Sequence, residues 1–128
     1  MAEILILGAG GFGTALAIMC AQNGHDVTLY SPFQQEIETL SAAREHKKLL
    51  PGVKIPETVR MVWELPQTVG APLVIVATPS FAVRGVCASI KGRIGRDTVV
   101  TCVSKCFETG TLKTLSQVIC EELPENSV

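Results

Sequence analysis

A glycine-rich turn between two apolar runs constrains this chain more than any other feature. Ile4–Leu7 is a short apolar run, the sequence GAGGFG occupies positions 8–13, and Thr14–Gln22 continues without Gly or Pro. These lengths predict a buried strand, a tight turn and a helix that ends at Gly24. A membrane-spanning helix is the alternative for so apolar a start, but it would carry four glycines near its beginning, and glycine weakens helices.

The composition is typical of one folded domain. The chain has 128 residues, 47% of them hydrophobic, and a net charge of −1. A chain of this length buries enough surface for a substantial core. The small net charge argues against a basic surface for nucleic acid. Glu3 is the only early charge, so the chain does not begin with the positive segment of a signal peptide.

The cysteines indicate a reducing compartment. There are five of them, and none forms a C-x-x-C pair. An odd number without the spacing of metal ligands favours free thiols, several of them small core residues. We therefore expect a cytoplasmic protein with no metal site.

Apolar runs predict four more strands after the first. They are expected at Val27–Tyr30, Val59–Val62, Leu73–Ala77 and residues 98–104. Residues 44–58 contain two prolines and a glycine and are expected to form an ordered loop.

Three more helices are expected between and after these strands. One begins at Ser31-Pro32, because proline is tolerated in a first helical turn, and has Ile37 and Leu40 on one face. Thr78 is expected to cap another, with Pro79 in its first position. The last helix is expected from Thr111, with four apolar residues at near-helical spacing, Leu112, Leu115, Ile119 and Leu123.

This alternation predicts an α/β fold with a doubly wound parallel sheet of the Rossmann type. We expect at least five strands in the order 3-2-1-4-5, joined by right-handed crossovers. In such folds ligands bind beyond the carboxyl ends of the strands, where the strand order reverses.

The sequence GAGGFG matches the G-x-G-x-x-G pattern of dinucleotide-binding turns, and its context between a strand and a helix strengthens the match. Gly8 would form the tight turn, Gly10 would let the backbone approach a pyrophosphate, and Gly13 would let the helix pack close to the sheet. The free N–H groups at the start of the helix would face the phosphates. A glycine turn without a ligand is the structural alternative.

The residues after the second strand bear on the choice of coenzyme. An NAD-preferring site usually has Asp or Glu there, whereas this chain has Tyr30-Ser31-Pro32-Phe33. No carboxylate is present to repel a 2′-phosphate, and no arginine to hold it. The pattern favours NADP, or the use of both NADP and NAD.

Five segments together resemble the N-terminal domain of bacterial NAD(P)-dependent glycerol-3-phosphate dehydrogenases. They are GAGGFGTALA, NGHDVTLY, HKKLLPGVKIP, VIVATPS and SKCFETGTLKTLSQV, and they extend along nearly the whole chain. The segment KKLLPGVKIP is the least generic, because it has no role in the general dinucleotide fold. The resemblance implies hydride exchange between NAD(P)H and dihydroxyacetone phosphate, giving sn-glycerol 3-phosphate for phospholipid synthesis.

The resemblance also implies site residues. Gly11 and Phe12 would contact the cofactor beside Gly8, Gly10 and Gly13, and Ser31 is a further candidate for cofactor binding. Lys105 would lie by the nicotinamide and touch the phosphorylated substrate, since a fixed ammonium can attract a phosphate or polarise a carbonyl. A solvated surface charge is the alternative for Lys105.

Two positions depart from the family pattern, and two histidines could be either structural or ligand-binding. Pro32 replaces a basic or imidazole side chain, which puts the contacts at the adenosine end in doubt. Cys106 replaces a glycine, and we expect it to be a packed small residue rather than a reactive thiol. His25 is expected to be structural, and His46 to lie on a solvated loop rather than bind a ligand directly.

Length is the largest departure. The family continues with a sixth strand and a mostly helical domain that carries the catalytic lysine base, so we expect residues 1–128 to be a cofactor domain that does not turn over alone. The missing domain is the expected partner, and the full-length enzyme could be a homodimer. Another Rossmann dehydrogenase with a helical second domain, or a non-catalytic nucleotide-binding module, stays open as an alternative.

Overall fold

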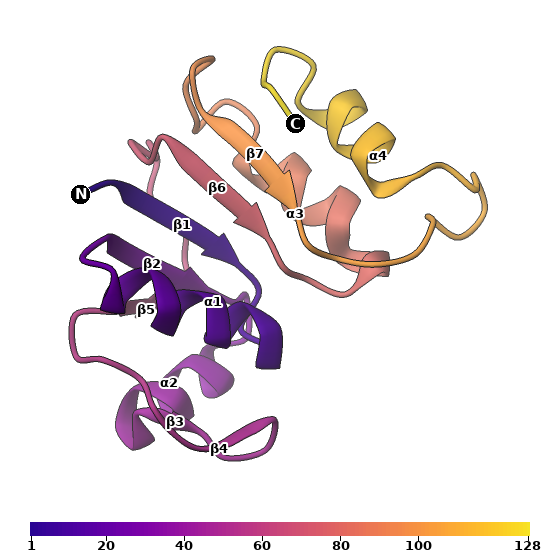
Figure 1. The fold of residues 1–128 in the computed structure, drawn as a ribbon. Coiled ribbons are helices and arrows are strands. Elements are labelled where there is room, and N and C mark those ends of the chain that lie inside the picture. Colours follow the sequence, from indigo (N-terminus) through magenta and orange to yellow (C-terminus); the bar gives the residue numbers. More distant parts are fainter.

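The computed structural model describes residues 1–128 and contains one parallel sheet with helices on both faces (Figure 1). Its five strands are β1 (Glu3–Leu7), β2 (Asp26–Tyr30), β5 (Arg60–Val62), β6 (Leu73–Val76) and β7 (Val99–Cys102). Their order across the sheet is β5-β2-β1-β6-β7, which is 3-2-1-4-5 in order of appearance. The predicted fold class and strand order are therefore confirmed.

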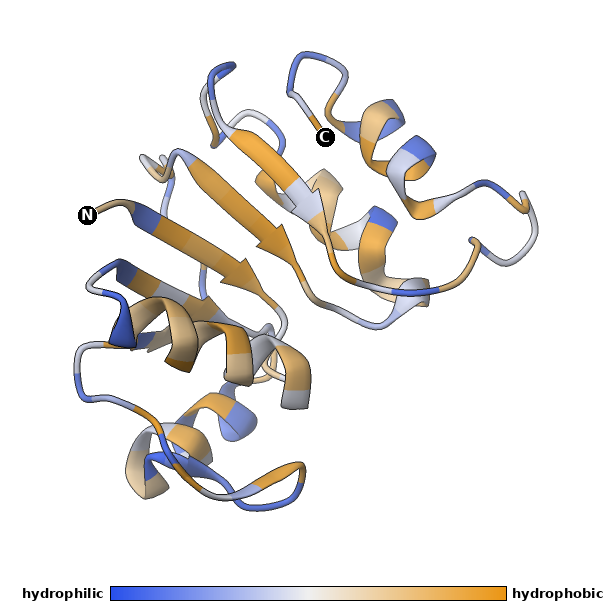
Figure 2. Cartoon of the chain, viewed as in Figure 1, coloured by the Kyte–Doolittle hydropathy of each residue, from blue (hydrophilic) through white to orange (hydrophobic).

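The central strand β1 is buried on both faces, as its apolar run predicts. It pairs in parallel with β2 and with β6, so that Leu7 lies opposite Tyr30 on one side and Val76 on the other. Successive side chains point to opposite faces: Leu5 and Leu7 belong to one core cluster, Ile4 and Ile6 to the other. Figure 2 shows most of β1 and of its neighbour β6 in the hydrophobic colour.

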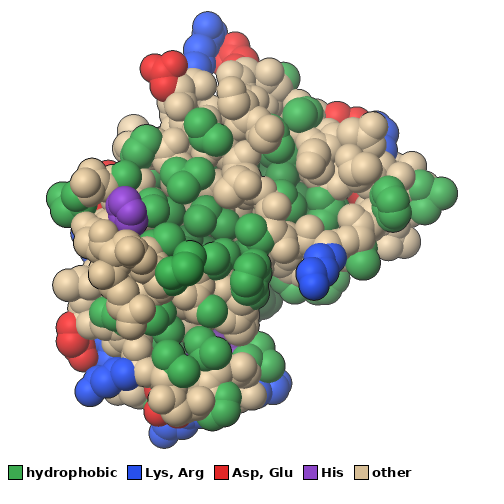
Figure 3. Space-filling model, in the orientation of Figure 1, with side chains coloured by type: hydrophobic (Ala, Val, Ile, Leu, Met, Phe, Trp, Pro, Cys, Tyr) green, Lys and Arg blue, Asp and Glu red, His purple; other side chains and the backbone are tan.

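The four α-helices divide between the two faces. On one face α1 (Gly11–Gln22) and α2 (Gln34–Ala43) pack with β2 and β5. On the other, α3 (Val83–Ile90) packs against α4 (Leu115–Glu122) beneath β6 and β7. The α1 face is open over β6 and β7 (Figure 1), and Figure 3 shows hydrophobic side chains gathering in the middle of that view.

Two helices do not begin where their prolines suggested. The helix expected at Ser31-Pro32 begins only at Gln34, because the buried Ser31 hydroxyl accepts a hydrogen bond from the Phe33 amide at 3.3 Å and keeps these residues in a turn. Thr78 caps no helix: Pro79 instead precedes the 3-10 turn η1 (Ser80–Ala82), and α3 follows.

The last helix is shorter than expected. It begins after Thr114, whose side chain and that of Gln117 form a reciprocal capping box. Leu112 lies outside the helix, is 78% exposed and has a φ of 57°. Apolar spacing alone placed the start of the helix too early because Leu112 fits the pattern by chance.

The expected loop at residues 44–58 contains an antiparallel hairpin, formed by β3 (Glu45–His46) and β4 (Leu50–Lys54). Arg44 ends α2 in the left-handed region, with a φ of 51°. Its carbonyl accepts from the Ile55 amide at 2.7 Å, and its guanidinium donates to the Val59 carbonyl at 3.0 Å. These bonds close the base of the hairpin, which the two-residue length of β3 made invisible to periodicity.

Smaller differences concern strand ends and cysteines. The helix expected at Thr14 starts three residues earlier, at Gly11, and the strands β5, β6 and β7 are each shorter than expected. Among the cysteines Cys87 is buried, whereas Cys106 and Cys120 are exposed. None of the helices has both the length and the apolar composition needed to cross a bilayer.

Candidate functional site

A large cavity lies at the carboxyl ends of β1, β2 and β6, where the strand order reverses. Its volume is about 1220 Å³, and its lining combines residues 8–12, 30–33, 45–49 and 77–79 with one side of α2 and one side of α3. Four of its lining side chains are large, apolar and exposed: Phe12, Phe33, Leu49 and Phe81. A mostly apolar cavity at the switch point of an α/β sheet is the usual place for a ligand.

The glycines of the turn after β1 have three distinct environments. Gly8 has a φ of +118°, and a Cβ there would lie 2.7 Å from the carbonyl carbon of Ala77. A Cβ at Gly13 would lie 2.1 Å from the Gly8 carbonyl oxygen, so α1 sits directly on the turn. A Cβ at Gly10 would meet nothing within 4 Å. Gly8 and Gly13 are therefore required by the fold, whereas the space beside Gly10 is free for a ligand.

The start of α1 offers unsatisfied donors to this cavity. Gly10 is the N-cap, no side chain accepts a hydrogen bond from the first turn, and no acidic residue lies in it. The first N–H groups of a helix have no partner within the helix, and the helix dipole favours an anion there. This end of α1 thus has the geometry and the polarity of a phosphate site.

Thr78 has a buried hydroxyl without a partner in the chain. It follows β6, lines the cavity and is 9% exposed. Its buried Oγ1 has no hydrogen-bond partner. A buried hydroxyl without a partner is rare in folded proteins.

The end of β2 forms another wall. Ser31 is 3% exposed, and its amide donates to the Val62 carbonyl at 3.1 Å. Burial raises the pKa of the Tyr30 phenol, with Arg93 acting in the opposite direction. Glu36, in the first turn of α2, is the carboxylate nearest to this wall in sequence, and burial raises its pKa.

The hairpin forms the opposite wall and corrects the expectation for His46. This side chain is buried, at 9% exposure, rather than solvated. Its Nε2 lies 3.1 Å from the Ala9 carbonyl oxygen, in the glycine turn. Leu49 approaches Gly11 closely, since a Cβ at Gly11 would lie 3.2 Å from the Leu49 Cβ. Lys47 and Lys48 also line the cavity.

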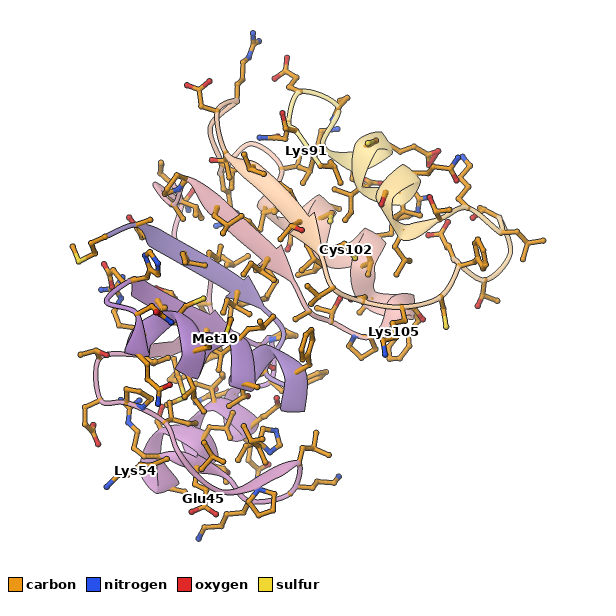
Figure 4. The ribbon with its side chains drawn as sticks, viewed as in Figure 1. Met19, Glu45, Lys54, Lys91, Cys102 and Lys105 are labelled. Carbon is orange, nitrogen blue, oxygen red and sulfur yellow. The ribbon has the colours of Figure 1, made fainter.

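Lys105 is exposed and does not line the cavity. It follows Ser104, whose hydroxyl donates to the Thr78 carbonyl, so its segment is held at the cavity's edge. Figure 4 shows Lys105 in the loop that leaves β7, beside the turn after β6.

Cys106 is exposed, with a φ of 97°, so the expectation of a packed small residue is wrong. The left-handed backbone at Cys106 explains why a glycine would suit this position.

Arg84 anchors the loop that carries Lys105. From α3 it donates to both carboxylate oxygens of Glu108, at 2.7 and 2.8 Å, and to Glu121 and Glu122 of α4 at 3.0 and 2.9 Å. The Arg84 and Thr111 hydrogen bonds lower the pKa of Glu108 to about 2. The sequence did not indicate this cluster, because the three glutamates lie 24 to 38 residues after Arg84.

The predicted site residues divide into two groups. One cavity is lined by five of them, Gly8, Gly10, Gly11, Phe12 and Ser31. The other two do not line it: Gly13 packs beneath the cavity, and Lys105 lies at its edge. No group of three His, Cys, Asp or Glu side chains is arranged to hold a metal ion. His25 accepts a hydrogen bond from the Ala2 amide at 3.1 Å, which is the structural role expected of it.

Three features of the cavity fit a dinucleotide: the free space at Gly10, the unpartnered N–H groups at the start of α1, and the apolar walls. The fold and the site together define a dinucleotide-binding domain of the Rossmann class. The family described as NAD-dependent glycerol-3-phosphate dehydrogenase N-terminus matches residues 3–128, and the chain belongs to this family.

Individual relatives agree with that assignment. A glycerol-3-phosphate dehydrogenase [NAD(P)+] of Fusobacterium nucleatum is 37% identical over 128 residues, covering 99% of this chain and 38% of the relative. The crystal structure of glycerol-3-phosphate dehydrogenase from Coxiella burnetii has a TM-score of 0.87 and 31% identity, covering 95% of this chain and 38% of that one. The chain therefore spans somewhat more than a third of these relatives' length.

Proposed function

We propose that this chain is the cofactor-binding domain of an sn-glycerol-3-phosphate dehydrogenase. The reaction is hydride exchange between NAD(P)H and dihydroxyacetone phosphate, which supplies glycerol 3-phosphate for phospholipid synthesis. The observation that carries the proposal is the open space at Gly10 beside the uncapped start of α1, within a family of this name. When bound, the nicotinamide supplies or accepts the hydride.

In this proposal the chain's own residues bind and orient the cofactor. The N–H groups at the start of α1 hold the pyrophosphate, and Gly10 leaves room for it. Phe12, 60% exposed on the cavity wall, packs against the cofactor, and Ser31 forms the wall beyond β2. Lys105 holds the phosphorylated substrate near the nicotinamide with its ammonium group.

We further propose that the site accepts both coenzymes and favours NADP. No carboxylate follows β2 directly, and two cations, Lys47 and Lys48, line the cavity on the hairpin. Glu36 acts in the opposite direction, because a carboxylate in the cavity disfavours a 2′-phosphate.

The other parts of the proposal concern the whole enzyme. Residues 1–128 bind the cofactor, and a C-terminal domain contributes the acid–base group; the full-length enzyme is cytoplasmic and a homodimer. The family membership and the relatives' greater length support the division into two domains, and the cysteine composition supports a cytoplasmic location.

Binding without turnover is the test. We expect the purified 128-residue chain to bind NADPH and NADH with modest affinity, NADPH more tightly, in a fluorescence titration. We expect no oxidation of NADPH that depends on dihydroxyacetone phosphate, because a proton donor within reach of the carbonyl is missing.

Each of the other outcomes has a definite meaning. Steady turnover by this chain would contradict the division of roles between two domains. Tighter binding of NADH would reverse the coenzyme preference. Binding by this chain combined with no activity of the full-length protein on dihydroxyacetone phosphate would favour another Rossmann dehydrogenase or a non-catalytic nucleotide-binding module.

A further inference from the structure

His46 makes hydrogen bonds with both of its ring nitrogens, and each bond goes to a different part of the site. Nε2 lies 3.1 Å from the Ala9 carbonyl oxygen, in the glycine turn. Nδ1 accepts a hydrogen bond from the Leu49 amide at 3.2 Å, within the hairpin turn. The two ends of the bond to Ala9 are 37 residues apart in sequence.

These partners determine the tautomer. The Leu49 amide can only donate, so Nδ1 must be the unprotonated nitrogen. The Ala9 carbonyl can only accept, so Nε2 must carry the proton. His46 in this arrangement is therefore a neutral imidazole that uses one donor and one acceptor, and both are satisfied.

The bond to Ala9 acts on the part of the turn that leads into α1. The Ala9 carbonyl belongs to the same planar peptide group as the Gly10 N–H, so holding the oxygen fixes the plane of that peptide. The only other donor to this oxygen is the Thr14 hydroxyl, at the long distance of 3.5 Å. A Cβ at Gly10 would meet nothing within 4 Å, so no side chain packs on that side of Gly10.

Hydrogen bonds of Arg44 tie the base of the hairpin to the segment that follows it. Arg44 closes its base through bonds to the Val59 carbonyl at 3.0 Å and the Ile55 amide at 2.7 Å. Leu49 packs near Gly11, on the same side as the His46 link. The hairpin and the glycine turn are thus joined by one polar and one apolar contact.

We propose that His46 is a positioning residue for the pyrophosphate site: its Nε2–H holds the Ala9 carbonyl and so presets the glycine turn for a phosphate-bearing ligand. This role rests on the proposed function, because it assumes that the turn binds the cofactor's phosphates. It also assigns a purpose to the hairpin segment, which the general dinucleotide fold does not require.

Two substitutions separate the two hydrogen bonds. In His46→Asn the side-chain oxygen can replace Nδ1 as the acceptor for Leu49, but the shorter side chain cannot reach Ala9. In His46→Gln the amide nitrogen can reach the position of Nε2 and donate to Ala9. His25→Gln is the matched control, because His25 accepts from the Ala2 amide at the opposite end of the strands.

The probes are ADP-ribose, which carries the pyrophosphate, and adenosine, which does not, both titrated by NMR. For His46→Asn we expect the Kd of ADP-ribose to rise about three- to tenfold, as for one lost hydrogen bond. We expect the Kd of adenosine to stay unchanged. His46→Gln and His25→Gln should bind both ligands like the parent chain. Exchange of the Thr14 amide, which donates to the Gly10 carbonyl at 3.0 Å, should accelerate in His46→Asn and not in His46→Gln.

The contrary results are equally definite. Parent-like binding of ADP-ribose by a folded His46→Asn chain would overturn the positioning role, as would equal weakening of ADP-ribose and adenosine. Weakening by His46→Gln to the level of His46→Asn would show that the Ala9 bond is not the determinant. If the parent chain itself binds neither NADH nor ADP-ribose, the proposed function fails instead.

Discussion

Single glycines in the turn after β1 have different consequences for folding and for binding. Gly10 has a φ of −74° and a ψ of −172°, extended backbone that any residue adopts, and open space beside it. Gly13 has the Gly8 carbonyl oxygen 2.1 Å from the position of a Cβ. One substitution should therefore affect the ligand, and the other the fold.

Replacing Gly10 with Val should leave the fold intact and weaken cofactor binding by at least about tenfold, since the side chain would occupy the path of the pyrophosphate. Gly13→Ala is the contrasting variant: forcing a methyl group into packed backbone should cost about 1–3 kcal/mol of the free energy of unfolding. Cofactor titration beside circular dichroism measures both effects. A folded Gly10→Val chain that binds like the parent would refute the phosphate role of the turn.

The role of Lys105 can be tested only in the full-length enzyme, because the proposed substrate site includes a second domain. If its ammonium holds the substrate, Lys105→Ala should lose about 1.5–3 kcal/mol of transition-state stabilisation, roughly ten- to a hundredfold in kcat/KM. Stability should change by less than about 0.5 kcal/mol, as for other exposed side chains. Lys105→Arg should not restore full activity, because a planar fork does not replace a compact ammonium. A near-normal kcat/KM for the alanine variant would show that Lys105 is an ordinary surface charge that does not hold the substrate.

Among the elements, the loop from β7 to α4 depends on charge rather than on apolar packing. Glu108 is held by both nitrogens of the Arg84 fork and by the Thr111 hydroxyl at 2.7 Å. These bonds lower the pKa of Glu108 to about 2 in the folded protein. A carboxyl group with a lowered pKa stabilises the fold above its unfolded pKa, and that contribution is lost as the pH falls through the folded pKa.

We therefore expect Glu108→Gln to lower Tm at neutral pH, and the difference from the parent to shrink between about pH 4.3, the usual pKa of Glu, and pH 2. Thermal melts across this range measure the effect. Glu57→Gln is the control, since Glu57 is 76% exposed in its pair with Arg44. A Tm difference for Glu108→Gln that stays constant down to pH 2 would contradict the assigned role of the pair.

Element by element, the sequence was informative where a local pattern decides the structure. The strand at Leu73–Val76 and the stop of α1 at Gly24, which has a φ of 84°, follow from apolar runs and backbone freedom. The start of α2, the hairpin and the burial of His46 depend on partners that are distant in sequence or on a buried hydroxyl. No periodicity encodes such contacts, so they appeared only in the structure.

At the scale of the whole molecule, the strand order could be predicted because right-handed crossovers leave few alternatives for alternating strands and helices. The glycine turn could be placed at the switch point for the same reason. The second wall of the cavity could not, because it comes from the hairpin, an addition to the basic fold. The Arg84 cluster also joins three segments whose proximity only the completed fold creates.

Residues 126 and 127 cover part of the outer edge of β7. Ser127 lies parallel to Val99, and its carbonyl accepts from the Val100 amide at 2.8 Å. The Asn126 side chain donates to the carbonyls of Gly95 and Thr98 at 2.8 and 2.9 Å. These two residues pair with backbone groups along the outer edge of β7. Without them, those groups would be available to another molecule.

Shortening the chain after Pro124 should therefore promote self-association. Without these residues the Val100 amide would be unpaired beside Val99, which is 45% exposed. The β7 strands of two molecules could then pair with each other. Light scattering over a concentration series should show self-association of the shortened chain at concentrations where the parent scatters little. Asn126→Ala, which keeps the Ser127 carbonyl in place, should stay close to the parent. Within residues 1–128, the segment after Pro124 would then keep this edge of β7 from pairing with another molecule, a role that is independent of any cofactor.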